Sequence, residues 1–308
     1  TGLGGRLDAT NVMSSPLAAI ITALGLEHTQ LLGPKISDIA REKAGIVKKG
    51  VPLILARQKP AIMSAALPVI QRICNERGAS LIQAHKHFTV KKRRIVYSSE
   101  TDGCFQEQEI LFLDKQQREI AVRIPMPGLH QAENVETVLT ALEILGQIDA
   151  RIVISRSVPG MAGTCWPGRV EILQGTSPMV VLDGAHCPLS SRALAETLLE
   201  VFPSRRFVLV FGLLRGKNVR EIFRPLCERL PLRQVIVFEP PSPRALPAGE
   251  ALCVIKSFFP GAQSAESPHM AAEQARAVTR SEDIIVVAGS IYSLDIMRQI
   301  FKQKGKCN

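Results

Sequence analysis

The second half of the chain alternates between short apolar runs and stretches with helical periodicity. The runs are rich in Val and Ile and apolar throughout, which is typical of strands buried on both faces of a sheet. They lie at Met179–Leu182, Phe207–Phe211, Gln234–Phe238 and Ile284–Ala288. Amphipathic stretches follow them at Ser190–Val201, Val219–Leu230, Pro268–Thr279 and Ser290–Phe301. This alternation predicts βαβ units and a doubly wound, mostly parallel, Rossmann-like α/β sheet.

The first half has the same α/β character but too few strands to close a sheet. The expected elements are strands at Leu17–Leu24 and Val51–Leu55 and helices at Ile36–Ala44, Ala61–Arg77 and Ala132–Leu145. From Phe88 to Ile124 the pattern becomes alternating and β-rich, with polar turns such as Ser98–Gly103, which predicts an antiparallel excursion. So short a parallel layer leaves an edge open, and we expect a further segment in front of it.

A Gly- and Pro-containing segment, Gly160–Gly168, separates the two halves and contains the only Trp. We expect the domain boundary near Trp166. Residues 1–166 then form an incomplete central domain, and residues 167–308 form a C-terminal α/β domain.

Composition narrows the class of partner. The 38 basic and 28 acidic residues give a net charge of +10, which suits anionic substrates. Aromatic residues make up 5%, and no basic stripe is interleaved with them, so we expect no nucleic-acid partner. The seven scattered cysteines include no CxxC pair, which indicates reduced thiols and a cytoplasmic location, or a mitochondrial or plastid one in a eukaryote. No apolar run reaches membrane-spanning length, so we expect no membrane partner.

Candidate chemistry collects after the strands, where open parallel sheets bind ligands. These loops contain DGAHCP at Asp183–Pro188, Gly212 with Arg215 and Lys217, Gly289–Ser290, and GLEHTQLLG at Gly25–Gly33. Turns are rich in such residues in any protein, but four loops with the same character favour a cleft suited to an anion.

Each candidate also has a plain structural interpretation. His28 could be a loop residue and Lys43 a surface charge. Asp183 and His186 could cap the helix that follows, and Arg169 could be an exposed hinge residue. The residues alone support a two-domain α/β protein with an anion site between the domains, and they leave these alternatives open.

A series of motifs in order resembles the folylpolyglutamate synthase and dihydrofolate synthase family, a branch of the Mur ligases. The motifs are GLGGRLDATN at Gly2–Asn11, GLEHTQLLG at Gly25–Gly33, REKAGI at Arg41–Ile46, GLHQAENVETVLTAL at Gly128–Leu142, PGRVE at Pro167–Glu171, DGAHCP at Asp183–Pro188 and AGSIY at Ala288–Tyr292. They extend over nearly the whole chain.

The resemblance implies an ATP- and Mg²⁺-dependent ligase that adds L-glutamate to a folate or dihydropteroate. We also expect the protein to be a monomer. ATP would phosphorylate the carboxylate, and the amine of glutamate would displace phosphate from the acyl phosphate. Carried over by motif, His28 and Lys43 would be metal ligands, Lys43 as a carbamate, and both would be catalytic together with Arg169. Asn134, Arg169, Asp183 and His186 would bind ATP. Asp8, Thr10, Asn11 and Ser290 would bind the substrates.

Four departures from the family pattern qualify this expectation. The GxxGKGS phosphate loop is absent from residues 1–308, and so is the glutamate that the family places two residues before Gly2. Cys187 replaces Asn, and LLRGKN at Leu213–Asn218 lacks the acidic residues of the family loop. We therefore expect a fragment that is inactive alone. The alternatives are a shortened, non-catalytic paralogue and, less in keeping with LDATN, a ligase acting on a peptidoglycan precursor.

Overall fold

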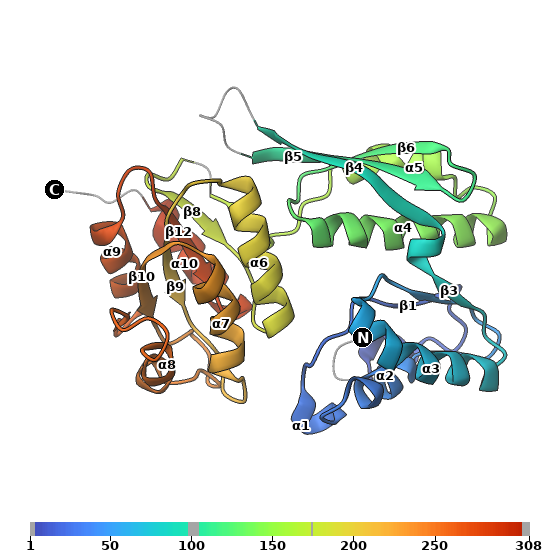
Figure 1. Ribbon diagram of the computed structural model, residues 1–308, viewed down its shortest axis with the longest axis horizontal. Coiled ribbons are helices and arrows are strands. Elements are labelled where there is room, and N and C mark those ends of the chain that lie inside the picture. The colour runs from blue at the N-terminus through green and yellow to red at the C-terminus, as the bar shows by residue number, and fades with distance from the viewer. Residues whose placement is uncertain (1–3, 98–104, 174, 304–308) are drawn as a thin grey trace. The chain divides into compact units, whose positions relative to one another are not determined.

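The computed structural model describes residues 4–97, 105–173 and 175–303. The chain divides into two compact units, of which the second consists mainly of the residues from Cys165 onward (Figure 1). We keep residues 1–166 and 167–308 as the proposed domain limits. The Ser98–Gly103 turn and the first residues of the GLGGR motif lie outside the described residues.

The second unit contains a six-stranded sheet in the order β11-β10-β9-β12-β8-β7. Its members are β7 (Glu171–Ile172), β8 (Met179–Leu182), β9 (Phe207–Phe211), β10 (Leu232–Val237), β11 (Gln263–Ser264) and β12 (Ile284–Ala288). All neighbours are parallel except the edge strand β7, which runs antiparallel to β8. The predicted doubly wound sheet is confirmed, and β8, β9 and β12 have the predicted bounds.

Helices cover both faces of this sheet and create two cores. They are α6 (Pro188–Val201), α7 (Val219–Arg229), α8 (Ala248–Ile255), α9 (Pro268–Val278) and α10 (Leu294–Lys302). Within β9, Phe207, Leu209 and Phe211 pack in one core with α6, α7 and α8, whereas Val208 and Val210 pack in the other with α9 and α10. Such alternation follows from the period of two along a strand. The helix expected from Ser290 begins instead as a 3-10 turn, η3 (Ile291–Ser293), before α10.

The first unit contains a parallel sheet in the order β1-β2-β3. Its strands are β1 (Ala19–Ile21), β2 (Leu53–Leu55) and β3 (Leu81–Gln83), and the helices α2 (Ile36–Ala44) and α3 (Pro60–Glu76) pack against each other beside it. Ile21, Leu53 and Ile70 are buried in their shared core. The predicted helix and strand types are confirmed, whereas β3 was not expected.

The expected antiparallel excursion is also present in the first unit. It consists of β4 (Phe88–Tyr97), β5 (Phe105–Asp114) and β6 (Glu119–Ile124), and β5 pairs antiparallel with β6. The long helix α4 (Leu129–Ile148) and the shorter α5 (Ile154–Met161) follow. Because α5 extends to Met161, it includes the first residues of the segment expected to be irregular.

Within the part of the chain that the structure describes, no helix is both long and apolar enough to span a bilayer. The described cysteines are free thiols: Cys74, Cys165, Cys187, Cys227 and Cys253.

Candidate functional site

Three loops meet at the carboxyl edge of the sheet in the second unit. The backbone N–H of Gly289 donates to the carbonyl of Ala185 at 2.8 Å, and that of Gly212 donates to the carbonyl of Ala288 at 3.2 Å. Gly289 has a φ of +106°, and a Cβ there would lie 2.3 Å from the Gly212 carbonyl oxygen. Only glycine fits this approach, so the loops after β8, β9 and β12 form one edge, as the sequence predicts.

Asp183 is the buried centre of this edge. Its Oδ1 accepts from the N–H of Ala185 at 2.8 Å, and its Oδ2 accepts from the N–H of Val170 at 2.9 Å. Burial raises the pKa of Asp183 to about 6, and the two backbone donors and the charge of Arg169 offset that rise only in part. Asp183 thus joins the DGAHCP loop to the turn that carries Arg169.

Arg169 is exposed at this edge, next to the same turn. Its Nη1 donates to the carbonyl of Gly168 at 3.2 Å, and that carbonyl also accepts from the N–H of Gly184 at 2.9 Å. The structure therefore brings Arg169 and Asp183 together, so that the charge of an exposed arginine acts on a buried carboxyl group.

His186 and Cys187 lie where α6 begins. The His186 Nδ1 donates to the carbonyl of Gly184 at 2.8 Å, which directs Nε2 away from this contact. Cys187 is the N-cap of α6, and its Sγ accepts from the N–H of Ser190 at 3.4 Å. Cysteine therefore takes a capping position that asparagine also favours, and the departure from the family pattern leaves the helix start intact.

Ser290 has a local structural role in the described residues. It is 2% exposed, and its Oγ accepts from the N–H of Tyr292 at 3.2 Å as the N-cap of η3. Its carbonyl accepts from the Ser293 hydroxyl at 2.7 Å. A substrate contact of Ser290 stays a prediction.

Sequence reasoning missed a cation at this edge, Arg244. Its Nη2 donates to the Tyr292 hydroxyl at 3.0 Å, and its guanidinium lies 5.7 Å from the centre of the Tyr292 ring. The N–H of Arg215 donates to the Arg244 carbonyl at 2.8 Å, which links the loops after β9 and β10. Arg244 lies in a proline-rich loop without helix or strand periodicity, so no local signal marked it.

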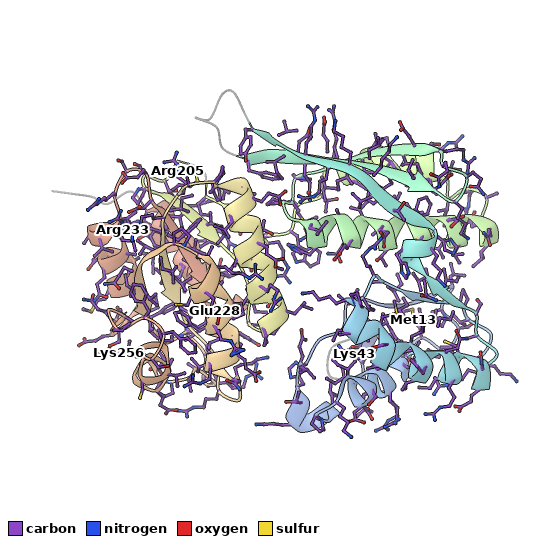
Figure 2. All side chains as sticks on the ribbon, in the orientation of Figure 1. Met13, Lys43, Arg205, Glu228, Arg233 and Lys256 are labelled. Atoms are coloured by element: carbon purple, nitrogen blue, oxygen red, sulfur yellow. The ribbon has the colours of Figure 1, made fainter. Side chains whose placement is uncertain are left out.

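In the first unit, the GLGGR and REKAG motifs pack against each other. The N–H of Gly5 donates to the Glu42 carbonyl at 2.6 Å. A Cβ on Gly5 would lie 2.3 Å from the Lys43 carbonyl oxygen, and one on Gly45 would lie 2.7 Å from the Arg6 nitrogen. The glycines therefore allow the loop to contact the last turn of α2, where the half-buried Lys43 lies (Figure 2).

The last residues of the GLGGRLDATN motif lie in a 3-10 helix, η1 (Ala9–Val12). Asp8 caps it by accepting from the N–H of Thr10 at 3.0 Å and from the Thr10 hydroxyl at 2.6 Å. Asn11 Nδ2 donates to the Arg6 carbonyl at 3.1 Å, and the Asn11 carbonyl accepts from Lys48 Nζ at 3.0 Å. These bonds hold Thr10 and Asn11 at the rim of a pocket.

This pocket has a volume of about 200 Å³. Its lining residues are Thr10, Asn11, Met13, Pro16, Ala18, Ala19, Ile20, Ile46 and Lys48. The Asn11 Oδ1 is buried and has no hydrogen-bond partner among the described residues. A pocket lined by both polar and apolar groups suits a small polar ring system that can donate a hydrogen bond.

The predicted metal ligands do not form a metal site by themselves. His28 is exposed at the N-cap of α1 (Thr29–Leu32), with left-handed φ and ψ of 52° and 36°. Among the described residues, no group of three or more His, Cys, Asp or Glu could hold a metal ion. Mg²⁺ prefers oxygen ligands, and a lysine ammonium group supplies none. The described residues as they stand therefore supply too few oxygen donors for Mg²⁺, and no chemical step is assigned to the ion.

The helix α4 carries one predicted residue and one that was missed. Asn134 is exposed, and its Nδ2 donates to Gln131 Oε1 at 3.0 Å. Glu136 is fully buried, and its Oε2 accepts from Arg57 Nη2 at 2.6 Å. Burial raises the pKa of Glu136 although Arg57 opposes the rise. A carboxylate on the apolar face of a helix is the signal that could have identified Glu136.

Comparison with known proteins finds ligases with similar sequences and folds. Residues 168–291 match the family described as Mur ligase, glutamate ligase domain. The chain is 29% identical over 303 residues to the dihydrofolate synthase/folylpolyglutamate synthase of Bacillus subtilis, covering 98% of this chain and 66% of that protein. It is 32% identical over 255 residues to the Mycobacterium tuberculosis protein of the same description, covering 80% of this chain and 49% of that protein.

Solved structures of folylpolyglutamate synthases have a similar fold. The Mycobacterium tuberculosis folylpolyglutamate synthase complexed with ADP and AMPPCP has a TM-score of 0.81 at 28% identity, covering 98% of this chain and 67% of that chain. The Thermotoga maritima folylpolyglutamate synthase has a TM-score of 0.70 at 29% identity, covering 100% of this chain and 65% of that chain.

The fold is of the Mur-ligase type, and residues 168–291 match the glutamate ligase domain of that family. More narrowly, the chain is similar over nearly its whole length to folylpolyglutamate synthases and dihydrofolate synthases. It spans about two thirds of the length of the Bacillus subtilis relative.

Proposed function

We propose that the protein containing this chain adds L-glutamate to a folate or a dihydropteroate at the expense of ATP. The observation that carries this proposal is the likeness, over 98% of the chain, to a folylpolyglutamate synthase complexed with ADP and AMPPCP. The γ-phosphoryl group of ATP is transferred to the substrate carboxylate. The amine of glutamate then attacks the acyl phosphate, loses a proton and forms the amide, and inorganic phosphate leaves.

Arg169 is the residue of the second unit best suited to this chemistry. It is an exposed cation whose charge acts on the buried Asp183, and a guanidinium can neutralise charge on a transferring phosphoryl group. Asn134, Asp183 and His186 act on the nucleotide in this proposal, and Ser290 lies close to the glutamate.

In the first unit, the pocket beside Asn11 is the proposed place for part of the folate. Its mixed polar and apolar lining, and the Asn11 Oδ1 that has no partner among the described residues, suit a heterocycle with amino groups. The hydrogen bond between Asp8 and Thr10 holds this loop in place. His28 and a carbamylated Lys43 are proposed metal ligands, which requires further oxygen donors. A phosphate loop, which residues 1–308 do not contain, is needed for turnover, so we propose that this chain alone is inactive. A monomeric state and a cytoplasmic location also stay predictions.

The test is glutamate incorporation by the protein expressed from the full reading frame that encodes these residues. Purified protein is incubated with ATP, Mg²⁺, L-glutamate and either dihydropteroate or a reduced folate, and the products are identified by mass spectrometry. We expect ATP-dependent addition of one glutamate residue, with kcat lowered about 10²-fold or more by Arg169→Ala.

The matched control is Arg205→Ala, because Arg205 is also exposed in the second unit but lies just before β9, at the other end of the strands (Figure 2). Binding of folate without any turnover would contradict the proposal and favour a non-catalytic relative.

A further inference from the structure

The turn that carries Arg169 has an uncommon backbone conformation. Gly168 has a φ of +75° and Val170 a φ of +48°, on either side of Arg169. A β-branched residue with positive φ is strained, and such a conformation persists only where its surroundings over-determine it. The contacts that hold this turn therefore also determine where the Arg169 guanidinium lies.

Two carboxylates bind the backbone N–H groups that flank Arg169. Glu171 Oε2 accepts from the N–H of Gly168 at 2.7 Å, and Asp183 Oδ2 accepts from the N–H of Val170 at 2.9 Å. Charged acceptors make stronger hydrogen bonds to N–H groups than neutral ones do. Glu171 and Asp183 thus hold the turn from two sides.

Glu171 is itself held by an arginine from a distant part of the chain. Arg298, on α10, donates from Nε to Glu171 Oε1 and from Nη2 to Oε2, both at 2.8 Å. The hydrogen bonds from Arg298 lower the pKa of Glu171, so the carboxylate stays charged. The close packing of Gly168 supports the same arrangement, since a Cβ there would lie 2.4 Å from Leu294 Cδ1, at the start of α10.

We propose that Glu171 and Arg298 are positioning residues for Arg169, acting through the backbone of the Gly168–Val170 turn. This inference rests on the proposed function for its consequence in catalysis. Both oxygens of Glu171 are engaged by Arg298 and Gly168, so Glu171 acts through the turn rather than on a substrate. Loss of the Glu171 charge should weaken both the Arg298 pair and the Gly168 bond and let the strained turn relax.

The first test needs no turnover. In the 308-residue chain, Glu171→Gln should increase amide hydrogen exchange at Gly168 and Val170 at least tenfold, with little change at Val286 in the centre of β12. Unchanged exchange at the turn would overturn the inference, whether or not the protein is a ligase.

The second test uses the full-reading-frame protein. Glu171→Gln and Arg298→Lys should each lower kcat for glutamate addition about tenfold or more while the KM for glutamate changes less than threefold. Equal kcat values for wild type and Glu171→Gln, in an enzyme that Arg169→Ala impairs, would overturn the inference. Absence of ligation by the wild type would instead refute the proposed function, which the exchange experiment distinguishes.

The matched control is a second arginine–carboxylate pair in the same unit. Arg233 donates from Nη2 to Asp283 Oδ1 at 3.2 Å and contacts Oδ2 through Nε, at the opposite, amino end of β10 and β12 (Figure 2). Asp283→Asn should lower the melting temperature without lowering kcat. A parallel loss of kcat in Asp283→Asn would show a general effect of destabilisation and overturn the positioning role.

Discussion

Replacing Gly5 with alanine tests how the glycine loop and α2 are packed. The Cβ of alanine would lie 2.3 Å from the Lys43 carbonyl oxygen and 2.4 Å from the Ile46 nitrogen, whereas ordinary contacts begin at 3.4 Å. Both contacts are to backbone atoms, so no side chain can rotate away. The loop must move by about 1 Å.

The cost of this movement follows from the contacts that it breaks. Overpacking costs about 1–3 kcal/mol. Displacement of the loop also weakens the Gly5 to Glu42 hydrogen bond of 2.6 Å, a loss of roughly 1 kcal/mol. We therefore expect Gly5→Ala to lower the free energy of opening the first unit by about 3 kcal/mol.

The assay is amide hydrogen exchange at Leu53 and Leu55, which are buried in that unit. Gly160→Ala is the matched control, because a Cβ on Gly160 meets nothing within 4 Å and Gly160 lies in the last turn of α5, in the same unit. Gly160→Ala should change the free energy of opening by no more than about 1 kcal/mol. A Gly5→Ala effect equally small would refute the packing argument.

Three further variants test charge and chemistry. Arg57→Ala should lower the free energy of unfolding by about 3 kcal/mol, more than Glu136→Gln does, because it leaves a buried carboxylate unpaired. In urea denaturation, this loss of stability should shrink as the pH falls and Glu136 becomes protonated. Burial raises the pKa of Asp183 from 3.8 to about 6, so its contribution to stability is complete below pH 3.8 and lost as the pH rises through about 6. Relative to Asp183→Asn, the unfolding free energy of the wild type should fall by about 3 kcal/mol over that window, and a flat difference in urea melts would contradict the assignment. Lys43→Ala in the full-reading-frame protein should reduce the rate of glutamate addition more than about 10²-fold, and added formate or acetate should restore part of the activity. Turnover equal to that of Lys49→Ala, a control at an exposed lysine, would contradict the carbamate hypothesis.

Four elements could be predicted with accurate bounds from the sequence. The buried strands β8, β9 and β12 match the expected ranges because their apolar runs are unambiguous, and the helix α2 matches because its apolar residues recur with the helical period. The strand β3 is only partly buried, and β7 and β11 are two residues long. Their pairing depends on strands formed elsewhere in the chain, so the local pattern did not predict them.

The site could be predicted only where local sequence determines it. The strand-end loops with Asp183 and Gly289 meet as expected, since parallel strands place their carboxyl ends at one edge. The pairs Arg244–Tyr292, Arg57–Glu136 and Arg298–Glu171 join residues 48, 79 and 127 positions apart. One sequence contains no signal for such pairs, and only the folded chain brings their partners together.

The fate of a carboxylate oxygen tests the proposed ligase mechanism most directly. A folate labelled with ¹⁸O in its side-chain carboxylate is incubated with the full-reading-frame protein, ATP, Mg²⁺ and L-glutamate, and the released phosphate is analysed by mass spectrometry. Because the acyl phosphate keeps the carboxylate oxygen bonded to phosphorus when the amine displaces phosphate, one ¹⁸O atom should appear in each inorganic phosphate. Amide formation with unlabelled phosphate would contradict the acyl-phosphate mechanism.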